Sequence, residues 1–214
     1  MAAERWLFWH RRDLRLADNL GLAAAAAATP ALTGVFVLDP AILGASDMAP
    51  ARVWFLLESL AELQQRWRQA GSRLIVLEGD PAVVLPQLAE ALHAPVVAWN
   101  RDVEPYGRAR DRQVAAQLQA AGRKVLVDWD QLLVAPEALK TGAGDPYRVY
   151  GPFWRNWRGQ VEQGDASGAL ALRPAPSGLL DLEQPLPAHL AVLEALPTAA
   201  ALGQSFDGAD LCPC

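Results

Sequence analysis

The sequence predicts an α/β fold, a doubly wound five-stranded parallel sheet of Rossmann-like type, followed by an extended connector. Three observations predict it. Five short apolar runs recur between residues 6 and 127, and longer helical patterns separate them. Continuous apolar strands that alternate with helices are typical of a parallel sheet covered on both faces, and right-handed crossovers make such a sheet doubly wound. The alternation then stops after about Trp129, where Pro, Gly and Ala become frequent.

The elements follow one another in a regular order. Strands are expected at residues 6–9, 32–38, 73–77, 96–99 and 124–127. Helices are expected at residues 20–28, 50–70, 81–93 and 108–121. Asp18 and Asn19 have the side chains and the spacing of an N-cap for the first helix. The helix at 50–70 has apolar residues three and four apart, and Gly71 ends it. Residues 147–157 carry many aromatic side chains and predict a short helix, and residues 164–196 predict an extended segment that wraps around its own domain.

Composition limits the kind of partner. The chain has 214 residues, a net charge of −5 and a pI near 5.2. Affinity for nucleic acid comes largely from Lys and Arg, so we expect no direct DNA binding by this acidic chain. Cys212 and Cys214 offer too few ligands for a closed zinc site and are interpreted as incidental. The sequence has no signal-peptide pattern and no long apolar stretch, so the expected location is the cytoplasm.

A ligand site is expected beyond the carboxyl ends of the strands, where open parallel sheets bind their ligands. Charged and polar residues follow the strands at 10–13, 39–40, 78–80, 100–104 and 128–130. The chain has no Gly-x-Gly-x-x-Gly fingerprint, Walker A sequence or nucleophile elbow, and its three histidines are scattered. These absences argue against a dehydrogenase or hydrolase and predict no catalytic residue and no metal ligand in this chain.

Three arginines gather after the first strand. Arg11, Arg12 and Arg15 lie within five residues, and the local carboxylates Asp13 and Asp18 are too few to pair with all of them. Two interpretations remain open at this stage. The arginines form either a solvated surface or a docking face for another domain.

Four separated motifs then identify a family. They are FWHRRDLRL with DN (residues 8–16 and 18–19), MAPAR (48–52), WNRDVEPYGR (99–108) and YRVYGPFW (147–154). In this order they resemble the DNA photolyase and cryptochrome family, most closely the cyanobacterial-type photolyases for cyclobutane pyrimidine dimers that use a deazaflavin antenna. The resemblance covers residues 1 to about 160.

The resemblance implies a two-domain enzyme in which an α/β domain holds an antenna pigment and passes excitation energy to FAD in a helical domain. That second domain would bind DNA and split pyrimidine dimers with light. The implied pigment is 8-hydroxydeazaflavin, with methenyltetrahydrofolate as the alternative. By similarity, the pigment pocket would be lined by Phe36, Val37, Leu38, Asp39, Met48, Ala49, Arg52, Asp102, Glu104 and Gly107.

The chemistry of these residues is compatible with a pigment site. Phe36 and Leu38 can hold a flat ring, although each also suits a strand core. Asp102 and Glu104 can accept hydrogen bonds, although local pairing explains them equally well. Arg52 can stabilise an anionic pigment, or it is a helix-surface arginine.

The resemblance also sets the expected domain organisation. Residues 1–135 are predicted to be the antenna-binding domain, and residues 136–214 an interdomain connector truncated before the FAD-binding helical domain. Residues 208–214 match nothing expected at that junction, so we expect this chain alone to repair no DNA. Two other functions stay open, a cryptochrome-type blue-light signalling module and a stand-alone nucleotide- or flavin-binding domain. The second would need phosphate-binding features that the sequence lacks.

Overall fold

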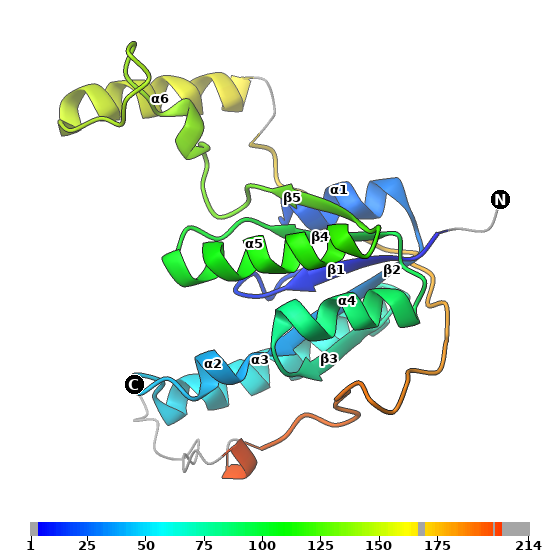
Figure 1. The fold of residues 1–214 in the computed structure, drawn as a ribbon. Coiled ribbons are helices and arrows are strands. Elements are labelled where there is room, and N and C mark those ends of the chain that lie inside the picture. The colour runs from blue at the N-terminus through cyan, green and yellow to red at the C-terminus, as the bar shows by residue number, and fades with distance from the viewer. Residues whose placement is uncertain (1–3, 167–169, 199, 203–214) are drawn as a thin grey trace, which may run out of the picture.

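A five-stranded parallel sheet forms the centre of the molecule (Figure 1). The structure, a computed structural model, describes residues 4–166, 170–198 and 200–202. The strands are β1 (Trp6–His10), β2 (Leu32–Leu38), β3 (Leu74–Glu78), β4 (Val96–Asn100) and β5 (Lys124–Asp128), in the order β3-β2-β1-β4-β5. The helices are α1 (Leu20–Ala28), α2 (Pro40–Leu43), α3 (Pro50–Gln69), α4 (Pro81–Ala91), α5 (Pro105–Ala120) and α6 (Tyr150–Ala166), with 3-10 turns η1 (Pro136–Ala138) and η2 (Ala200–Leu202).

Helices cover both faces of the sheet, so the doubly wound fold is confirmed. On one face, α4 and α5 pack on side chains such as Leu7, Val35 and Val97. On the other face, α1 and α3 pack on side chains such as Phe8 and Phe36. Each strand from β1 to β4 is buried almost along its whole length because apolar side chains face a helix layer on both sides.

Two helices differ from the prediction. The fourth predicted helix, α5, begins at Pro105 rather than at residue 108, because proline suits the first position of a helix, where its missing N–H is not needed. The short helix α2 was not predicted. It begins at Pro40, and the side chain of Asp39 caps it by accepting a hydrogen bond from the backbone N–H of Ala41 at 3.0 Å.

Helix α6 is longer than expected. The predicted short helix is 17 residues long, and it stands apart from the sheet at the end of the β5 connection (Figure 1). Several of its large apolar side chains are exposed, including Tyr150 and Trp154.

The extended segment at 170–198 returns along the sheet domain, as predicted. Its backbone forms hydrogen bonds to three parts of the domain. The N–H of Leu179 donates to the carbonyl oxygen of Ala70 at 2.8 Å, and Val192 forms an antiparallel bridge to Leu77 in the edge strand β3. The Leu180 N–H donates to the carbonyl oxygen of Pro30. This segment therefore covers the β3 edge of the sheet. Cys212 and Cys214 lie outside the described residues.

Candidate functional site

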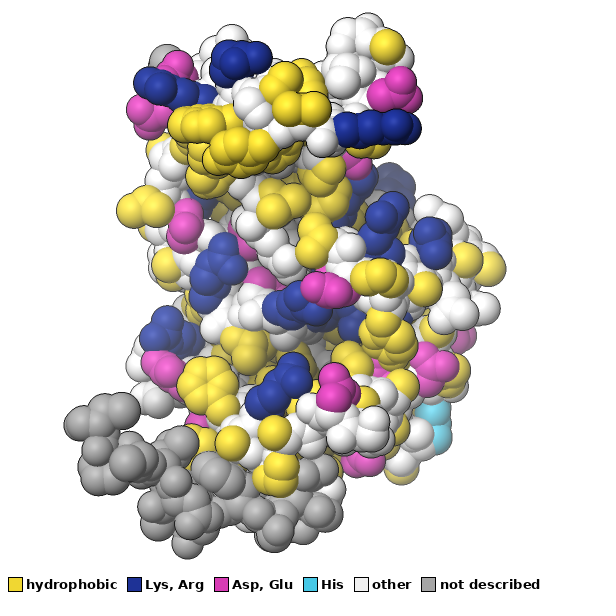
Figure 2. Space-filling model, turned by 90° about the vertical axis from the view of Figure 1, so that its left-hand side faces the viewer, with side chains coloured by type: hydrophobic (Ala, Val, Ile, Leu, Met, Phe, Trp, Pro, Cys, Tyr) yellow, Lys and Arg dark blue, Asp and Glu magenta, His cyan; other side chains and the backbone are white. Residues whose placement is uncertain are grey.

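A cavity of about 860 Å³ opens at the carboxyl ends of the strands, between α3, α2 and the beginning of α5. This is the edge at which doubly wound sheets bind ligands, and Figure 2 shows basic, acidic and hydrophobic side chains mixed across the middle of this face. The volume lies within the range typical of small-molecule sites, about 300–1,000 Å³.

The cavity gathers most of the residues proposed from the sequence. Phe36, Val37, Asp39, Met48, Arg52, Asp102, Glu104 and Gly107 all line it. Leu38 and Ala49 do not. The side chain of Leu38 is 1% exposed and packs in the core shared with α1 and α3, which is the strand-core alternative considered for it. Ala49 precedes α3 as its N-cap residue.

Asp102 is one of two buried carboxylates in the cavity wall, the other being Asp39. Its Oδ2 lies 3.7 Å from Arg12 on the β1 loop and 3.7 Å from Arg110 on α5, while its Oδ1 accepts a hydrogen bond from the backbone N–H of Glu104 at 3.0 Å. A Cβ atom at Gly107 would clash with the carboxylate, so glycine lets the first turn of α5 approach Asp102 closely. The carboxylate is thus held by two cations and one N–H, and its position is fixed before any ligand arrives.

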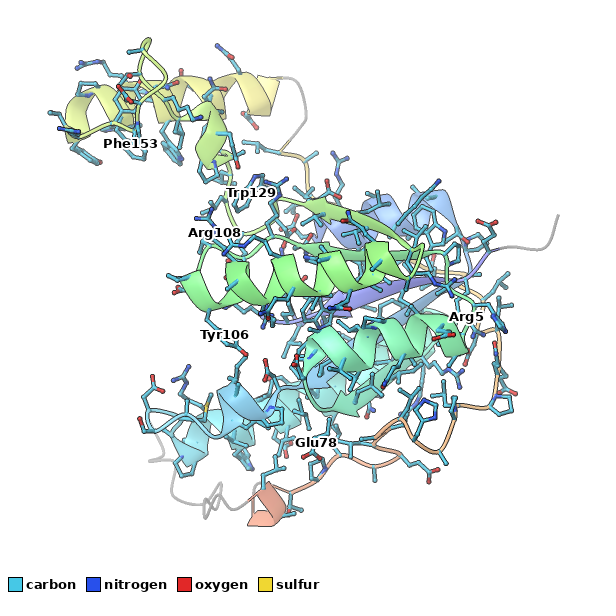
Figure 3. The ribbon with its side chains drawn as sticks, viewed as in Figure 1. Arg5, Glu78, Tyr106, Arg108, Trp129 and Phe153 are labelled. Carbon is cyan, nitrogen blue, oxygen red and sulfur yellow. The ribbon has the colours of Figure 1, made fainter. Side chains whose placement is uncertain are left out.

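Tyr106 was missed by the sequence reasoning as a site residue. Its hydroxyl donates to Asp39 Oδ2 at 2.7 Å and so joins α5 to the start of α2 beside the cavity (Figure 3). Burial and the hydrogen bond to Asp39 raise the pKa of Tyr106 to about 12. The phenol therefore stays protonated and keeps donating at neutral pH. Its place inside the third motif, WNRDVEPYGR, was the available signal.

Arg52, on α3, is a further cation in the wall of the cavity. Among the residues that the structure describes, no carboxylate pairs with its guanidinium, whereas Arg12 is shared between Asp102 and Glu104 at 3.7 Å each. One turn further along α3, Phe55 also lines the cavity although it is 68% exposed. Phe55 thus adds exposed aromatic surface to the wall of the cavity beside Arg52.

The three arginines after β1 have found partners at a distance. Arg11 forms an ion pair with Asp111 on α5, and Arg15 Nη2 lies 2.7 Å from Asp130 Oδ2 after β5. Arg12 faces the carboxylates of the cavity, as described above. The local count of carboxylates was therefore misleading, because the fold brings acids from other strand ends to these cations.

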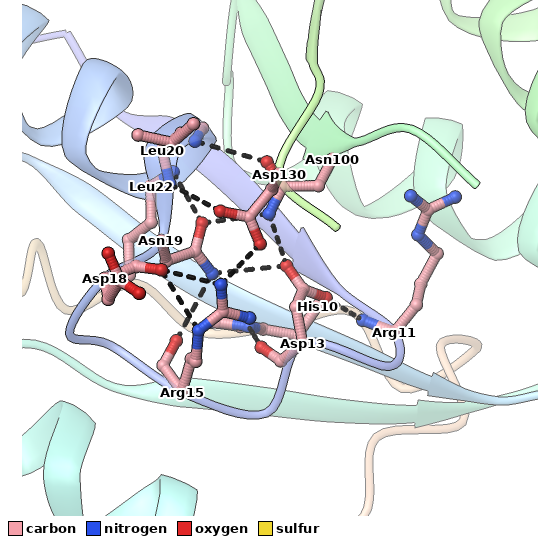
Figure 4. A network of polar contacts seen from close by, with 11 residues as sticks. His10, Arg11, Asp13, Arg15, Asp18, Asn19, Leu20, Leu22, Asn100 and Asp130 are labelled. Atoms are coloured by element: carbon pink, nitrogen blue, oxygen red, sulfur yellow. Dashed lines mark hydrogen bonds and ion pairs between the residues drawn. The ribbon is translucent and has the colours of Figure 1, made fainter. Parts of the chain in front are cut away.

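A buried polar network ties the strand ends together behind the cavity (Figure 4). Asn100 Nδ2 donates to Asp13 Oδ2 at 2.6 Å and to Asn19 Oδ1 at 2.9 Å, and Asn100 Oδ1 accepts from the Gly21 N–H at 3.2 Å. Asn19 caps α1 as predicted, because its Oδ1 accepts from the N–H of Leu22 at 3.0 Å. Much of the first motif thus has a structural role.

His10 belongs to the same region and is fully buried. The indole Nε1 of Trp67, which can only donate, lies 3.1 Å from His10 Nε2, so that nitrogen accepts. His10 Nδ1 therefore carries the proton and donates to the carbonyl oxygen of Asp13 at 2.9 Å. Burial lowers the pKa of His10, since no water solvates the charged form. The ring is a neutral structural element and not an acid–base group.

Two general features of the described residues limit the chemistry. They contain no group of three or more His, Cys, Asp or Glu side chains that could hold a metal ion. None of their helices is both long and apolar enough to cross a lipid bilayer.

The fold defines an α/β domain of the doubly wound class, with a cavity of small-molecule size at its strand ends. A family model described as DNA photolyase matches residues 6–176, and the chain belongs to this family. It is 52% identical over 204 residues to the deoxyribodipyrimidine photo-lyase of a Synechococcus strain, an alignment that covers 94% of this chain and 41% of that protein. The chain thus spans less than half the length of this relative.

Solved structures agree with the assignment. A class III photolyase from Agrobacterium tumefaciens matches with a TM-score of 0.72 and 33% identity, over 87% of this chain and 37% of that one. A Synechocystis cryptochrome also matches with a TM-score of 0.72, at 27% identity over 95% and 41%. A photolyase from Sulfolobus tokodaii, solved with two FAD molecules that implied a novel light-harvesting cofactor, gives 0.60 and 27% identity over 71% and 34%. The chain is homologous to the N-terminal domain of these proteins.

Proposed function

We propose that the cavity at the strand ends binds an antenna pigment, and that this domain passes excitation energy to FAD held by a further domain in a longer protein. In such a protein the energy would drive light-dependent repair of cyclobutane pyrimidine dimers. Membership of the DNA photolyase family supports the proposal, as does the light-harvesting cofactor implied for the Sulfolobus neighbour. The observation that carries it is the cavity of about 860 Å³, whose walls hold aromatic side chains and Arg52, a cation without an ion-pair partner among the described residues.

The composition of the cavity suits a pigment. Energy transfer needs no nucleophile, acid or base, but it does need a chromophore held at a fixed distance and orientation. Phe36, Met48 and Phe55 supply apolar surface for a flat ring, and Met adapts its shape to irregular gaps. Asp102, which is held by its neighbours before binding, supplies a fixed hydrogen-bond acceptor.

We propose 8-hydroxydeazaflavin as the pigment, with methenyltetrahydrofolate as the alternative. The argument rests on Arg52, whose guanidinium has no ion-pair partner in the part of the chain that the structure describes, because the ring hydroxyl of the deazaflavin can ionise. A charge-assisted contact to a partly desolvated anion contributes about 1.5–3 kcal/mol. That is roughly a tenfold to hundredfold gain in affinity.

Pigment retention tests the proposal directly. The purified 214-residue chain is incubated separately with 8-hydroxydeazaflavin, methenyltetrahydrofolate and FAD, passed through a desalting column, and examined by absorption. We expect the deazaflavin to be retained at one molecule per chain. Arg52→Gln should weaken its binding about tenfold or more, by the magnitude of a charge-assisted contact.

Arg68→Gln is the matched control, because Arg68 is an exposed arginine on the same helix and lies outside the cavity. Retention of none of the three pigments would refute the proposal. Equal deazaflavin affinity in the Arg52→Gln and Arg68→Gln variants would remove the charge argument. Retention of folate alone would assign the alternative pigment.

A cryptochrome-type signalling role is the second candidate, because the Synechocystis cryptochrome and the Agrobacterium photolyase match this chain with the same TM-score. Pigment binding by this chain does not separate the two. The separating experiment is a dimer-repair assay on the longer protein under blue light, in which repair activity assigns the photolyase function.

A further inference from the structure

A second cavity, of about 490 Å³, lies between α5, the ends of β4 and β5, and the turn η1. It shares Asp102 with the pigment cavity but otherwise has its own walls. We propose that it binds a small phosphate monoester that carries a planar ring. The volume falls in the lower part of the range typical of small-molecule sites.

Two arginines give this cavity its charge. Arg108 and Arg112 lie four residues apart on α5 and both line it, and among the residues that the structure describes neither guanidinium has an ion-pair or hydrogen-bond partner. The third arginine, Arg101, is already paired with Glu137 at 3.4 Å. Two like charges on one helix face are unfavourable unless an anion lies between them.

The remaining acids of the cavity do not neutralise this pair. Asp111 forms ion pairs with Arg11 and Arg110, and Asp102 lies 3.7 Å from Arg12 and Arg110. Arg11, Arg12 and Arg110 all lie outside the second cavity. An excess of two positive charges is therefore left at Arg108 and Arg112, which matches the charge of a phosphate monoester.

A buried indole also lines this cavity. Trp99 lines the cavity and is 1% exposed, and its indole Nε1 has no hydrogen-bond partner among the described residues. The indole N–H can only donate, and a buried donor without an acceptor is costly. This nitrogen is itself closed to the cavity, so what Trp99 offers a ligand there is the apolar surface of its ring.

The other walls suit a flat apolar group. Val103, Ala115, Val127 and Pro136 contribute apolar surface, and Trp129 lies beside them. The Arg101 guanidinium is 5.3 Å from the Trp129 ring centroid, which fixes that indole as one wall (Figure 3 labels Arg108 and Trp129 on this side of α5). Paired cations for a phosphate together with an aromatic wall for a ring are the recognition chemistry of a nucleotide-like molecule.

Calorimetric titration of the 214-residue chain tests the proposal, with AMP as the probe and adenosine and inorganic phosphate as its two halves. We expect AMP to bind, adenosine and phosphate each to bind at least tenfold more weakly, and the AMP affinity to fall as salt is raised. The variant Arg108→Gln/Arg112→Gln should weaken AMP at least tenfold. Both substitutions are at exposed positions, so the midpoint of the unfolding transition should be unchanged.

Controls decide which part of the proposal holds. Arg68→Gln, an exposed arginine away from both cavities, should bind AMP like the parent chain. No binding of AMP at millimolar concentration, or equal binding by the double variant, would overturn the site. Phosphate that binds as tightly as AMP would overturn the assignment of a planar ring.

Discussion

Asn100→Ala is predicted to be among the most destabilising single changes in the sheet domain. The side chain makes three hydrogen bonds in a nearly dry site, including one of 2.6 Å to the buried Asp13 carboxylate. A hydrogen bond to a charged group contributes about 1.5–3 kcal/mol and each neutral one about 0.5–1.5 kcal/mol. The sum is roughly 2.5–6 kcal/mol, or a fall in Tm of roughly 5–24 °C for a chain of this size. Urea unfolding followed by tryptophan fluorescence measures it.

Two further variants test the reasoning. Gln113→Ala, an exposed change on α5, should alter the unfolding free energy by less than about 0.5 kcal/mol. Asn100→Asp keeps the shape but places a second carboxylate against Asp13, so it should be strongly destabilising at pH 7 and partly recover as the pH falls toward 5, where one carboxyl group takes up a proton. If the free energy of unfolding of Asn100→Ala lies within about 1 kcal/mol of the parent value, the claim that this network holds the strand ends together is refuted.

Three other outcomes follow from the contacts around the site. The fold lowers the pKa of His10 below its usual 6.5. The contribution of this neutral ring to the free energy of unfolding should therefore be complete above pH 6.5 and should be lost below it, by up to about 1.4 kcal/mol per pH unit. His10→Gln should flatten this pH dependence in urea titrations between about pH 7.5 and 5.5. Gly34→Ala would place a Cβ atom 2.5 Å from the Trp67 ring and should lower the free energy of unfolding by about 1–3 kcal/mol. An unchanged free energy of unfolding would show that the close approach of Gly34 and Trp67 is absent. The difference in phenolate absorbance between the parent and Tyr106→Phe should titrate near pH 12, and a midpoint near pH 10 would show that the hydrogen bond to Asp39 is absent.

The sheet and its helices were predictable because their signals are local and repeated. Apolar runs of strand length and helical spacing in α3 are properties of neighbouring residues, and the N-cap at Asn19 needs only three residues to form. The general position of the candidate site was predictable once the fold class was known, because a doubly wound sheet brings the polar ends of its strands together.

The pairing of charges was not predictable from local sequence. Arg11 and Asp111 are 100 residues apart, and Arg15 and Asp130 are 115 apart, so a count of nearby acids missed both partners. The local sequence also does not show which apolar side chains of a strand line the cavity and which lie in the core. Phe36 and Leu38 are two residues apart in one strand and both read as apolar, yet only Phe36 lines the cavity.

The path of residues 170–198 affects where an independently folding fragment can be cut. Leu179 and Leu190, on this returning stretch, are each more than nine-tenths buried. Leu190 packs in the apolar layer on one face of the sheet, and Leu179 packs in the layer on the opposite face. The same stretch gives β3 a neighbour on its outer side, where bare backbone donors and acceptors would otherwise recruit a foreign strand. A fragment that stops soon after β5 would keep all five strands but lose both leucines and the cover of β3, and it should self-associate.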